Sequence, residues 1–228
     1  MASGYLGTNC TISEVTHTRS SLRPRSRRKM TQILAAAGQL FREHGYGETS
    51  MDAVALRAGV SKATVYAHFS DKRELFSAIV FSEDAERGRA LIESVHGAGD
   101  LRARLSRLGR AVFDLLMAPE TIATHRVVAA EAARFPEIGR AYYENGAARL
   151  LQRLEEIFAG AMAAGELRTA HPRRAAEQFV GLVRGDLQLR AMLGVETGIT
   201  KSLSDTVVRS GVDTFYRAYV LNGRRGRS

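Results

Sequence analysis

Segment 59–72 contains the residues whose types and spacing most clearly define a chemistry. Lys62, Tyr66 and His68 can each donate a hydrogen bond to a phosphate oxygen or to a base edge. At helical spacing they flank a nearly flat face of small side chains, namely Ala63, Thr64 and Ala67. A helix with so flat a face can approach a nucleic-acid groove closely. The alternative is a short surface helix whose lysine and tyrosine are only solvated.

The surrounding residues predict a helix at residues 62–69 that holds this face outward. Ser61 is a good N-cap, and Val60 can pack against Val65 as a hydrophobic staple. Val65 and Phe69 share the opposite side of the helix, so we expect both to face a core.

Two helices are expected before this segment. The first begins between residues 24 and 31, and Gly45-Tyr46-Gly47 ends it. Ser50 caps the second, and Gly59 ends it as a left-handed turn residue. The second and third helices, joined by a short turn and with the third facing outward, form a helix-turn-helix that the first helix supports.

A long helix is expected after Phe69. Asp71 and Glu74 can form a capping box at its start. Lys72 lies in the first turn, where free backbone amides and a lysine make a natural phosphate site. The alternative for Lys72 is a solvated helix terminus.

Composition bounds the class of protein. The chain has 228 residues, of which 45% are hydrophobic and 25% charged, so it can bury a core as one medium domain or two small ones. No run approaches the ~18 apolar residues of a membrane span, and residues 1–20 lack the apolar centre of a signal peptide, so we expect a cytoplasmic protein. Cys10 is the only cysteine, which excludes an intrachain disulfide and a thiolate metal cluster.

The net charge of +9 indicates an anionic partner, and most of the excess lies at the two ends of the chain. The basic residues near the ends are Arg19, Arg23, Arg25, Arg27, Arg28 and Lys29, then Arg224, Arg225 and Arg227. The first group adjoins the candidate DNA-binding segment, where release of counterions would favour contact with phosphates. The alternative is that these tails only increase solubility.

Four stretches within residues 30–80 together resemble the tetracycline-repressor (TetR) family of bacterial one-component regulators. They are Phe41-Arg42-Glu43-His44-Gly45-Tyr46, Thr49-Ser50, the run Ala-Gly-Val-Ser-Lys-Ala-Thr-Val-Tyr-Ala-His-Phe at 58–69, and Lys72-Arg73-Glu74-Leu75. The resemblance implies that the third helix enters the major groove and that Tyr66 and Lys72 hold phosphates. It also implies that bases are approached by Lys62, Ala63, Thr64 and His68. The complete set of expected DNA contacts is Ser50, Lys62, Ala63, Thr64, Tyr66, His68 and Lys72.

The rest of the chain is predicted to be helical. The expected helices are 100–118 with an Asp100 cap, 121–135, 137–164, one that Pro172 opens and that continues to Met192, and 202–221. Phe135-Pro136-Glu137-Ile138 and Tyr142-Tyr143-Glu144-Asn145-Gly146 resemble the branch of the family that has an AefR-like C-terminal domain.

The helices after residue 100 are expected to enclose a ligand cavity and to form a dimer interface. A mostly apolar cavity could be lined by Phe113, Met117, His125, Phe135, Tyr142 and Phe179, with Arg126 and Glu131 as further polar anchors. The wide apolar faces of the last two helices predict a homodimer interface at Phe179, Val183, Leu187, Val208, Val212, Phe215 and Tyr219. The alternatives are that these residues are ordinary core or surface, and that the apolar faces are covered within one chain.

These observations predict an all-α protein with a disordered tail at 1–22, a helix-turn-helix DNA-binding domain at 23–80, a ligand-binding and dimerisation domain at 81–223, and a basic tail at 224–228. The expected function is that of a homodimeric repressor that binds a palindromic operator and is released by a small molecule, without a cofactor or metal. An enzyme is not expected, because no glycine-rich phosphate loop, Gly-x-Ser-x-Gly elbow or His-Glu-x-x-His motif occurs. The alternatives are an architectural DNA-binding protein without a ligand and, last, an enzyme on a helical scaffold.

Overall fold

The computed structural model describes residues 24–80, 99–196 and 198–220. Every regular element in these residues is helical, and one isolated antiparallel bridge joins Leu167 to Val220. The prediction of an all-α fold is confirmed. The predicted tails at 1–22 and 224–228, with their basic residues, lie outside the described residues.

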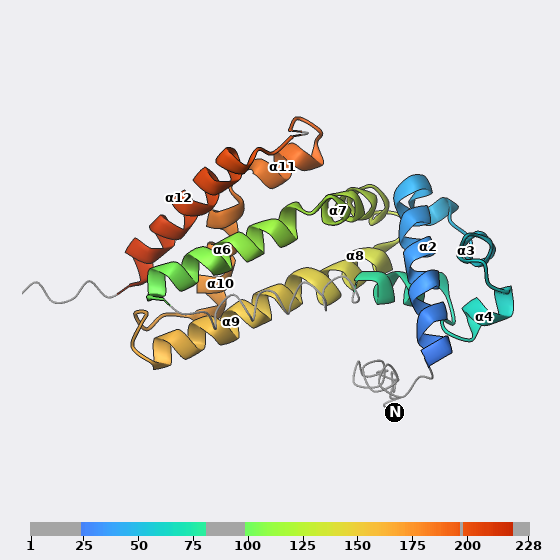
Figure 1. Ribbon diagram of the computed structural model, residues 1–228, viewed down its shortest axis with the longest axis horizontal. Coiled ribbons are helices and arrows are strands. Elements are labelled where there is room, and N and C mark those ends of the chain that lie inside the picture. Colours follow the sequence, from blue (N-terminus) through green and yellow to red (C-terminus); the bar gives the residue numbers. More distant parts are fainter. Residues whose placement is uncertain (1–23, 81–98, 197, 221–228) are drawn as a thin grey trace, which may run out of the picture.

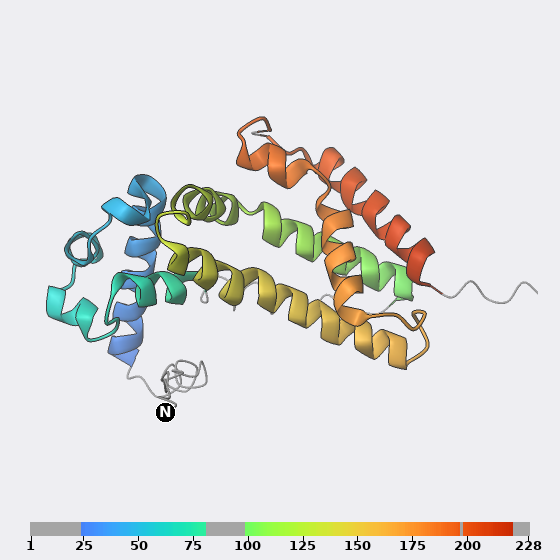
Figure 2. The same ribbon diagram turned by 180° about the vertical axis from the view of Figure 1, so that it is seen from behind.

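Figure 1 shows an elongated molecule with helices of the first 80 residues at one end. In chain order the helices are α2 (Pro24–Glu48), α3 (Met51–Ala58), α4 (Lys62–Tyr66), residues 72–80, α6 (Leu101–Met117), α7 (Pro119–Glu131), α8 (Pro136–Tyr142), the π-helical turn η1 (Tyr143–Ala147), α9 (Ala148–Ala163), α10 (Pro172–Arg184), α11 (Leu187–Met192) and α12 (Lys201–Tyr219). The view from behind in Figure 2 shows α7 and α8 beside α2, between the two ends.

The first apolar core forms where α2, α3, α4 and residues 72–80 meet. Phe41, Tyr46 and Phe76 pack edge to face or tilted, with ring centroids 5.5–5.7 Å apart. The same core includes Val128 of α7 and Ile138 of α8, both buried. Side chains from beyond residue 80 therefore complete the core of the N-terminal helices.

The second core lies among α6, α9, α10 and α12. The rings of Phe158, Phe179 and Phe215 have centroids 4.9–5.3 Å apart, and all three are fully buried. Helices α10 and α12 approach each other closely at Gly211, where a Cβ would lie 2.4 Å from the carbonyl oxygen of Leu182. Only glycine fits at this crossing.

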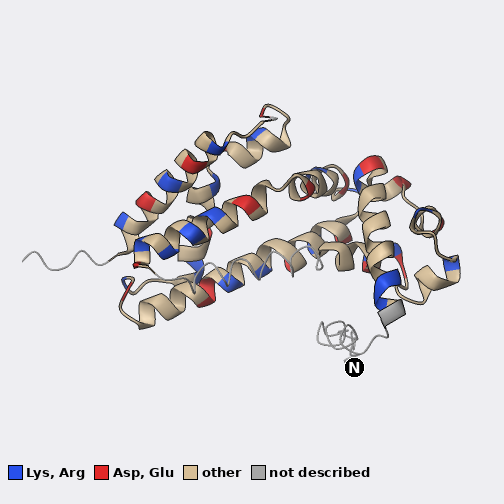
Figure 3. Ribbon diagram, in the orientation of Figure 1, with Lys and Arg blue, Asp and Glu red and all other residues tan. Residues whose placement is uncertain are grey.

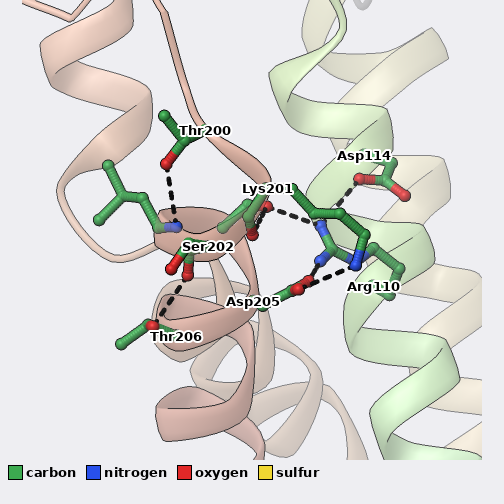
Figure 4. Close-up of polar contacts among 9 residues, drawn as sticks. Arg110, Asp114, Thr200, Lys201, Ser202, Asp205 and Thr206 are labelled. Atoms are coloured by element: carbon green, nitrogen blue, oxygen red, sulfur yellow. Dashed lines mark hydrogen bonds and ion pairs between the residues drawn. The ribbon is translucent and has the colours of Figure 1, made fainter.

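Polar contacts also join α6 to the start of α12 (Figure 4). Arg110 of α6 forms an ion pair with Asp205 and donates a hydrogen bond to the hydroxyl of Ser204 at 3.1 Å. Lys201 approaches the same Asp205 at 3.0 Å, and the Thr200 side chain caps α12. The partly buried contacts of Arg110 set the register of α12 against α6.

The predicted helix at 137–164 is present as an unbroken helical run at 136–163 that contains one π-helical turn. The run divides into α8, η1 and α9 because the Ala148 N–H bonds to the Tyr143 carbonyl, five residues back. The side chain of Asn145 donates to the Ala141 carbonyl at 3.0 Å and so helps to satisfy the altered backbone.

The prediction that the helix from Pro172 continues to Met192 is wrong. Gly185 has a φ of 54° and a ψ of −142°, which interrupts the helix and separates α10 from α11. The last helix is Lys201–Tyr219, close to the predicted 202–221.

The predicted dimer-interface residues require a correction. Phe179, Val183, Leu187, Val208, Val212, Phe215 and Tyr219 are all buried inside one chain. The alternative left open above therefore holds for these residues: α10 and α12 direct their widest apolar faces toward α6, α9 and each other. If the chain dimerises, it uses other side chains.

Candidate nucleic-acid interface and ligand cavity

The exposed helix α4 is shorter than predicted. It spans Lys62–Tyr66, because the carbonyl of Val65 accepts hydrogen bonds from both the His68 N–H at 3.0 Å and the Phe69 N–H at 2.9 Å, which tightens the last turn. Phe69 still reaches the core and is buried. The predicted Ser61 cap is present, since its Oγ accepts from the Thr64 N–H at 3.2 Å.

The outward face of α4 is uncovered among the described residues. Lys62, Ala63 and Tyr66 are exposed, whereas Thr64 and His68 are half-buried. The Lys62 ammonium lies 2.8 Å from a carboxylate oxygen of Asp52 in α3, and this hydrogen bond raises the pKa of Lys62. Lys62 is thus held as a charged group on the exposed side of α3 and α4.

Ser50 is the N-cap residue of α3, as Ser61 is of α4. Its Oγ accepts a hydrogen bond from the Ala53 N–H at 3.1 Å, and the side chain is exposed. Gly59 ends α3 with a φ of 65°, as predicted for a left-handed turn residue. This glycine sets the angle between α3 and α4.

Lys72 is placed differently from the predicted phosphate contact. Its ammonium donates three hydrogen bonds, to the carbonyls of Tyr46 at 2.7 Å, Gly47 at 3.0 Å and Thr49 at 2.9 Å. Burial lowers the pKa of Lys72, and the nearby carboxylates, Glu131 first among them, oppose this shift. All three protons of the ammonium are used at the C-terminal end of α2, where the helix dipole favours a cation. In this arrangement Lys72 positions the helices.

The predicted capping box after Phe69 is present in a modified form. The Asp71 carboxylate accepts from the Glu74 N–H at 2.7 Å, as expected. The Glu74 carboxylate accepts from both the N–H and the hydroxyl of Ser70 at 2.7 Å, one residue before the predicted partner. These bonds start the helix at residues 72–80 and so place Lys72.

Helix α7 and the residues after it also contact the end of α2, which Lys72 holds. The predicted stop at Gly45 is a kink with a φ of 80°, after which the helical segment continues to Glu48. Glu131 of α7 accepts a hydrogen bond from the Gly47 N–H at 3.1 Å, and the Phe135 ring packs edge to face on Tyr46 at 5.3 Å. Sequence reasoning missed this contact, because no local pattern links residues so far apart in the chain.

A cavity of about 420 Å³ lies between the end of the helix at residues 72–80 and the helices after residue 100. Most of its lining is apolar and comes from Val80, Leu115, Leu116, Leu150, Leu151 and Val180. Its polar side chains include His125, Tyr142, Glu177, Arg184 and Gln188. The His125 ring lies 5.3 Å from the Tyr142 ring, and burial followed by the charge of Arg184 lowers the pKa of His125.

The structure brings only two of the predicted ligand residues to this cavity, His125 and Tyr142. Phe113 and Phe179 lie in the second core, Met117 packs against that core, and Phe135 packs on Tyr46. Arg126 donates to the carbonyls of Ala191 at 2.5 Å and Met192 at 2.8 Å, and Glu131 bonds to Gly47. Sequence reasoning missed the wall from α10, where Glu177, Gly181 and Arg184 share one face at helical spacing.

Residues 24–80, 99–196 and 198–220 contain neither a metal site nor a membrane-spanning helix. No group of three or more His, Cys, Asp or Glu in these residues is arranged to hold a metal ion. None of the helices there is both long and apolar enough to cross a membrane.

Comparisons with known proteins match both parts of the chain. The family described as bacterial regulatory proteins, tetR family, matches residues 33–79, and the AefR-like transcriptional repressor, C-terminal domain, matches residues 103–220. Among solved structures, a putative TetR-family regulator from Mesorhizobium loti is 31% identical with a TM-score of 0.78, covering 87% of this chain and all of that chain. The flavonoid-responsive regulator FrrA is 35% identical with a TM-score of 0.71, covering 86% of this chain and 99% of FrrA.

Curated relatives match over shorter stretches. The HTH-type transcriptional activator FasR of Mycolicibacterium smegmatis is 37% identical over 93 residues, which are 41% of this chain and 42% of FasR. The HTH-type transcriptional regulator UidR of Escherichia coli is 39% identical over 70 residues, 29% of this chain and 35% of UidR. The matches thus span less than half the length of these two relatives. Together with the helix-turn-helix, the two family matches show that the chain belongs to the TetR family of DNA-binding transcriptional regulators, which are not enzymes, in the branch with an AefR-like C-terminal domain.

Proposed function

We propose that this regulator is a cytoplasmic homodimeric repressor that leaves a palindromic operator when a small molecule fills the cavity. The DNA-binding domain would be residues 23–80, and residues 81–223 would bind the ligand and the second copy. One observation supports this function best: α7 lines the cavity with His125 and contacts the DNA-binding helices with Glu131.

The DNA would lie against the exposed face of α4. Lys62 and His68 would reach base edges, Ala63 and Thr64 would allow close approach, and Tyr66 would hold a phosphate. Ser50 would bind a phosphate at the start of α3. Lys72 would act by positioning these helices. Figure 3 shows basic residues at the start of α2, where exposed Arg27 and Arg28 could add phosphate contacts.

A dimer is needed because one short helix makes few base contacts. Two copies of α4 about 34 Å apart would address one face of a palindrome. Exposed apolar side chains on and just after α11 support a protein contact there, with Leu189 58%, Leu193 69% and Val195 69% exposed. A second copy covering these residues, together with the outer faces of α10 and α12, would replace the interface that the sequence predicted.

Helix α7 would transmit ligand binding to the DNA. Its residue His125 lies at the cavity and Glu131, six positions later, lies at the kink in α2, while Arg126 ties α7 to the end of α11. A ligand that prefers one position of α7 would shift the DNA-binding helices. A coupling free energy of ~1–3 kcal/mol is enough for such a switch.

Two names among the relatives bear on this proposal. FrrA is named as flavonoid-responsive, which supports a small, ring-containing effector for this chain as well. The C-terminal match is to a repressor domain, whereas FasR is named as an activator. We propose repression, because the match to the repressor domain extends over residues 103–220, whereas the match to FasR covers 41% of this chain.

An operator selected from random-sequence DNA would test the function. We expect a palindrome, protection of two half-sites one helical turn apart, and a reporter that is more active without the protein than with it. A small-molecule library screened against the complex should contain compounds that release the DNA. Sequence-independent binding that no compound alters would favour the architectural alternative, and a reporter that needs the protein would favour activation.

A further inference from the structure

The cavity has a cationic side chain at one edge whose charge is not matched by an acid. Arg184 of α10 donates a hydrogen bond to the side-chain oxygen of Gln188 at 2.7 Å. In the described parts of the chain it forms no ion pair. Glu177, the acid on the same wall, is already engaged, because Arg173 donates to its carboxylate at 3.1 Å. The wall therefore presents a net positive charge at Arg184.

The guanidinium has one buried partner and several free donors. Arg184 is exposed at the edge of the cavity, and one of its nitrogens bonds to the oxygen of Gln188, which is only 5% exposed. A guanidinium has five N–H donors in a rigid fork, so donors remain for a ligand. A cation with remaining donors is a good partner for an oxyanion.

His125 faces the same space from α7. The charge of Arg184 contributes to the lowered pKa of His125, so the two groups are close enough to interact. Neutral imidazole has one N–H donor, and its ring lies against Tyr142. An anion between Arg184 and His125 would meet a charged fork on one side and a neutral donor on the other.

The remainder of the cavity is apolar and suits a hydrophobic body. Leu115, Leu116, Leu150 and Leu151 form its walls, and the volume of about 420 Å³ is within the range of small-molecule sites. We propose that the effector is an amphipathic organic acid, with an apolar ring-containing body and one carboxylate or other oxyanion that Arg184 binds and His125 contacts. This inference rests on the proposed function of the cavity.

Two fluorescent probes with the same ring skeleton test the charge directly. Anilinonaphthalene sulfonate is anionic, and N-phenylnaphthylamine is its neutral counterpart. We expect the wild-type protein to bind the anionic probe more tightly. Arg184→Gln should weaken binding of the anion by about tenfold or more, the effect of losing one charge-assisted hydrogen bond, and leave the neutral probe within about twofold. Arg184→Lys should restore part of the preference.

A matched control lies on the same helix. Arg174 is exposed and does not line the cavity, so Arg174→Gln should leave the affinities of both probes unchanged. The proposal of an anionic ligand would be overturned if Arg184→Gln and Arg174→Gln changed the probe affinities equally. It would also be overturned if Arg184→Gln lowered the affinities for the two probes by the same factor.

A third variant separates this inference from the function on which it rests. Gly181 lines the cavity, and a Cβ there would meet no atom within 4 Å, so Gly181→Phe should fill space in the cavity without a clash at its base. We expect Gly181→Phe to lower the affinity of the protein for both probes. If both probes bind Gly181→Phe as they bind the wild type, the cavity is not the ligand site and the proposed function fails. If Gly181→Phe blocks binding but Arg184→Gln has no selective effect, only the anionic ligand is excluded.

Discussion

Glu131 and Lys72 hold the same residue, Gly47, from opposite sides. Glu131 accepts a hydrogen bond from the Gly47 N–H at 3.1 Å, and Lys72 donates to the Gly47 carbonyl at 3.0 Å. The end of α2 is therefore fixed jointly by α7 and by the start of the helix at residues 72–80. A movement of α7 has a direct route to the DNA-binding helices.

Substitution of Glu131 should weaken the response to effector. Glu131→Ala leaves the half-buried Gly47 N–H without its acceptor, so we expect the free energy of unfolding to fall by about 1–3 kcal/mol. We also expect a smaller ratio of operator affinities without and with effector. Glu131→Gln keeps an acceptor oxygen and should retain most of that ratio. Urea denaturation and DNA titrations measure both quantities, and an unchanged ratio in Glu131→Ala would exclude this route.

Substitution of Lys72 separates positioning from phosphate binding. Lys72→Met removes three hydrogen bonds, and we expect the free energy of unfolding to fall by roughly 2–3 kcal/mol. The slope of log affinity for DNA against log salt should stay the same, because the ammonium is occupied by carbonyls. A slope lower by about one unit in a folded Lys72→Met protein would show that Lys72 does hold a phosphate.

Lys62 and Tyr66 should have different roles on DNA. Lys62→Ala should change the preferred bases, whereas Tyr66→Phe should weaken binding to all sequences alike. Both side chains are exposed, and the Lys62–Asp52 pair lies on the surface, so neither change should cost more than about 1 kcal/mol of stability. Repeating the operator selection with each variant measures this, and the same selected sequence with Lys62→Ala would contradict the assignment.

Substitution of two glycines by alanine should change the stability of the protein in opposite directions. Both glycines lie on helices of the second core. Gly211→Ala places a Cβ 2.4 Å from the Leu182 carbonyl oxygen, and we expect a loss of about 1–3 kcal/mol. Gly160→Ala in α9 meets no atom within 4 Å and should increase stability by about 0.5–1 kcal/mol, because alanine favours a helix. Denaturation curves compare them, and a stable Gly211→Ala variant would mean that α10 and α12 can separate at low cost.

His125 should make the protein less stable in mild acid. Its pKa is lowered by burial in the folded state, so the unfolded chain binds a proton more readily as the pH falls below about 6.5. The free energy of unfolding should therefore decrease from pH 7.5 toward pH 5.5, through the ordinary pKa and down to the lowered one. The free energy of unfolding of the His125→Asn variant should decrease less over this range. Identical pH profiles of the two proteins would show that His125 is not the group responsible.

Local features of the fold were predictable from sequence, since they depend on neighbouring residues. Ser50, Ser61, Asp100 and Gly59 cap the helices as expected. The end of α4 was not predictable to the residue, because the tightened turn at Val65 depends on burying Phe69. The kink at Gly45 likewise depends on Glu131, which occupies the space that a side chain there would need.

Long-range partners were not predictable in the same way. The periodic apolar residues of α10 and α12 indicated that these faces are buried, but periodicity does not tell whether the cover is the same chain or a second copy. Phe179 and Phe215 fill the core of one chain. His125 and Tyr142 reach the cavity while Phe113 does not, because helix rotation decides which of several apolar residues borders a space.

The π-helical turn η1 accommodates one extra residue beside the cavity. Loss of one residue between Tyr143 and Ala147 would let the segment close as an ordinary α-helix, and because the narrower turn offsets the shorter chain, α9 would keep its orientation about its axis. Leu150, Leu154 and Phe158, which α9 buries, would then stay in the core. A deletion within α9 itself has no such compensation and would rotate the residues after it by ~100°, so relatives that share this core should vary in length at η1 and not within α9.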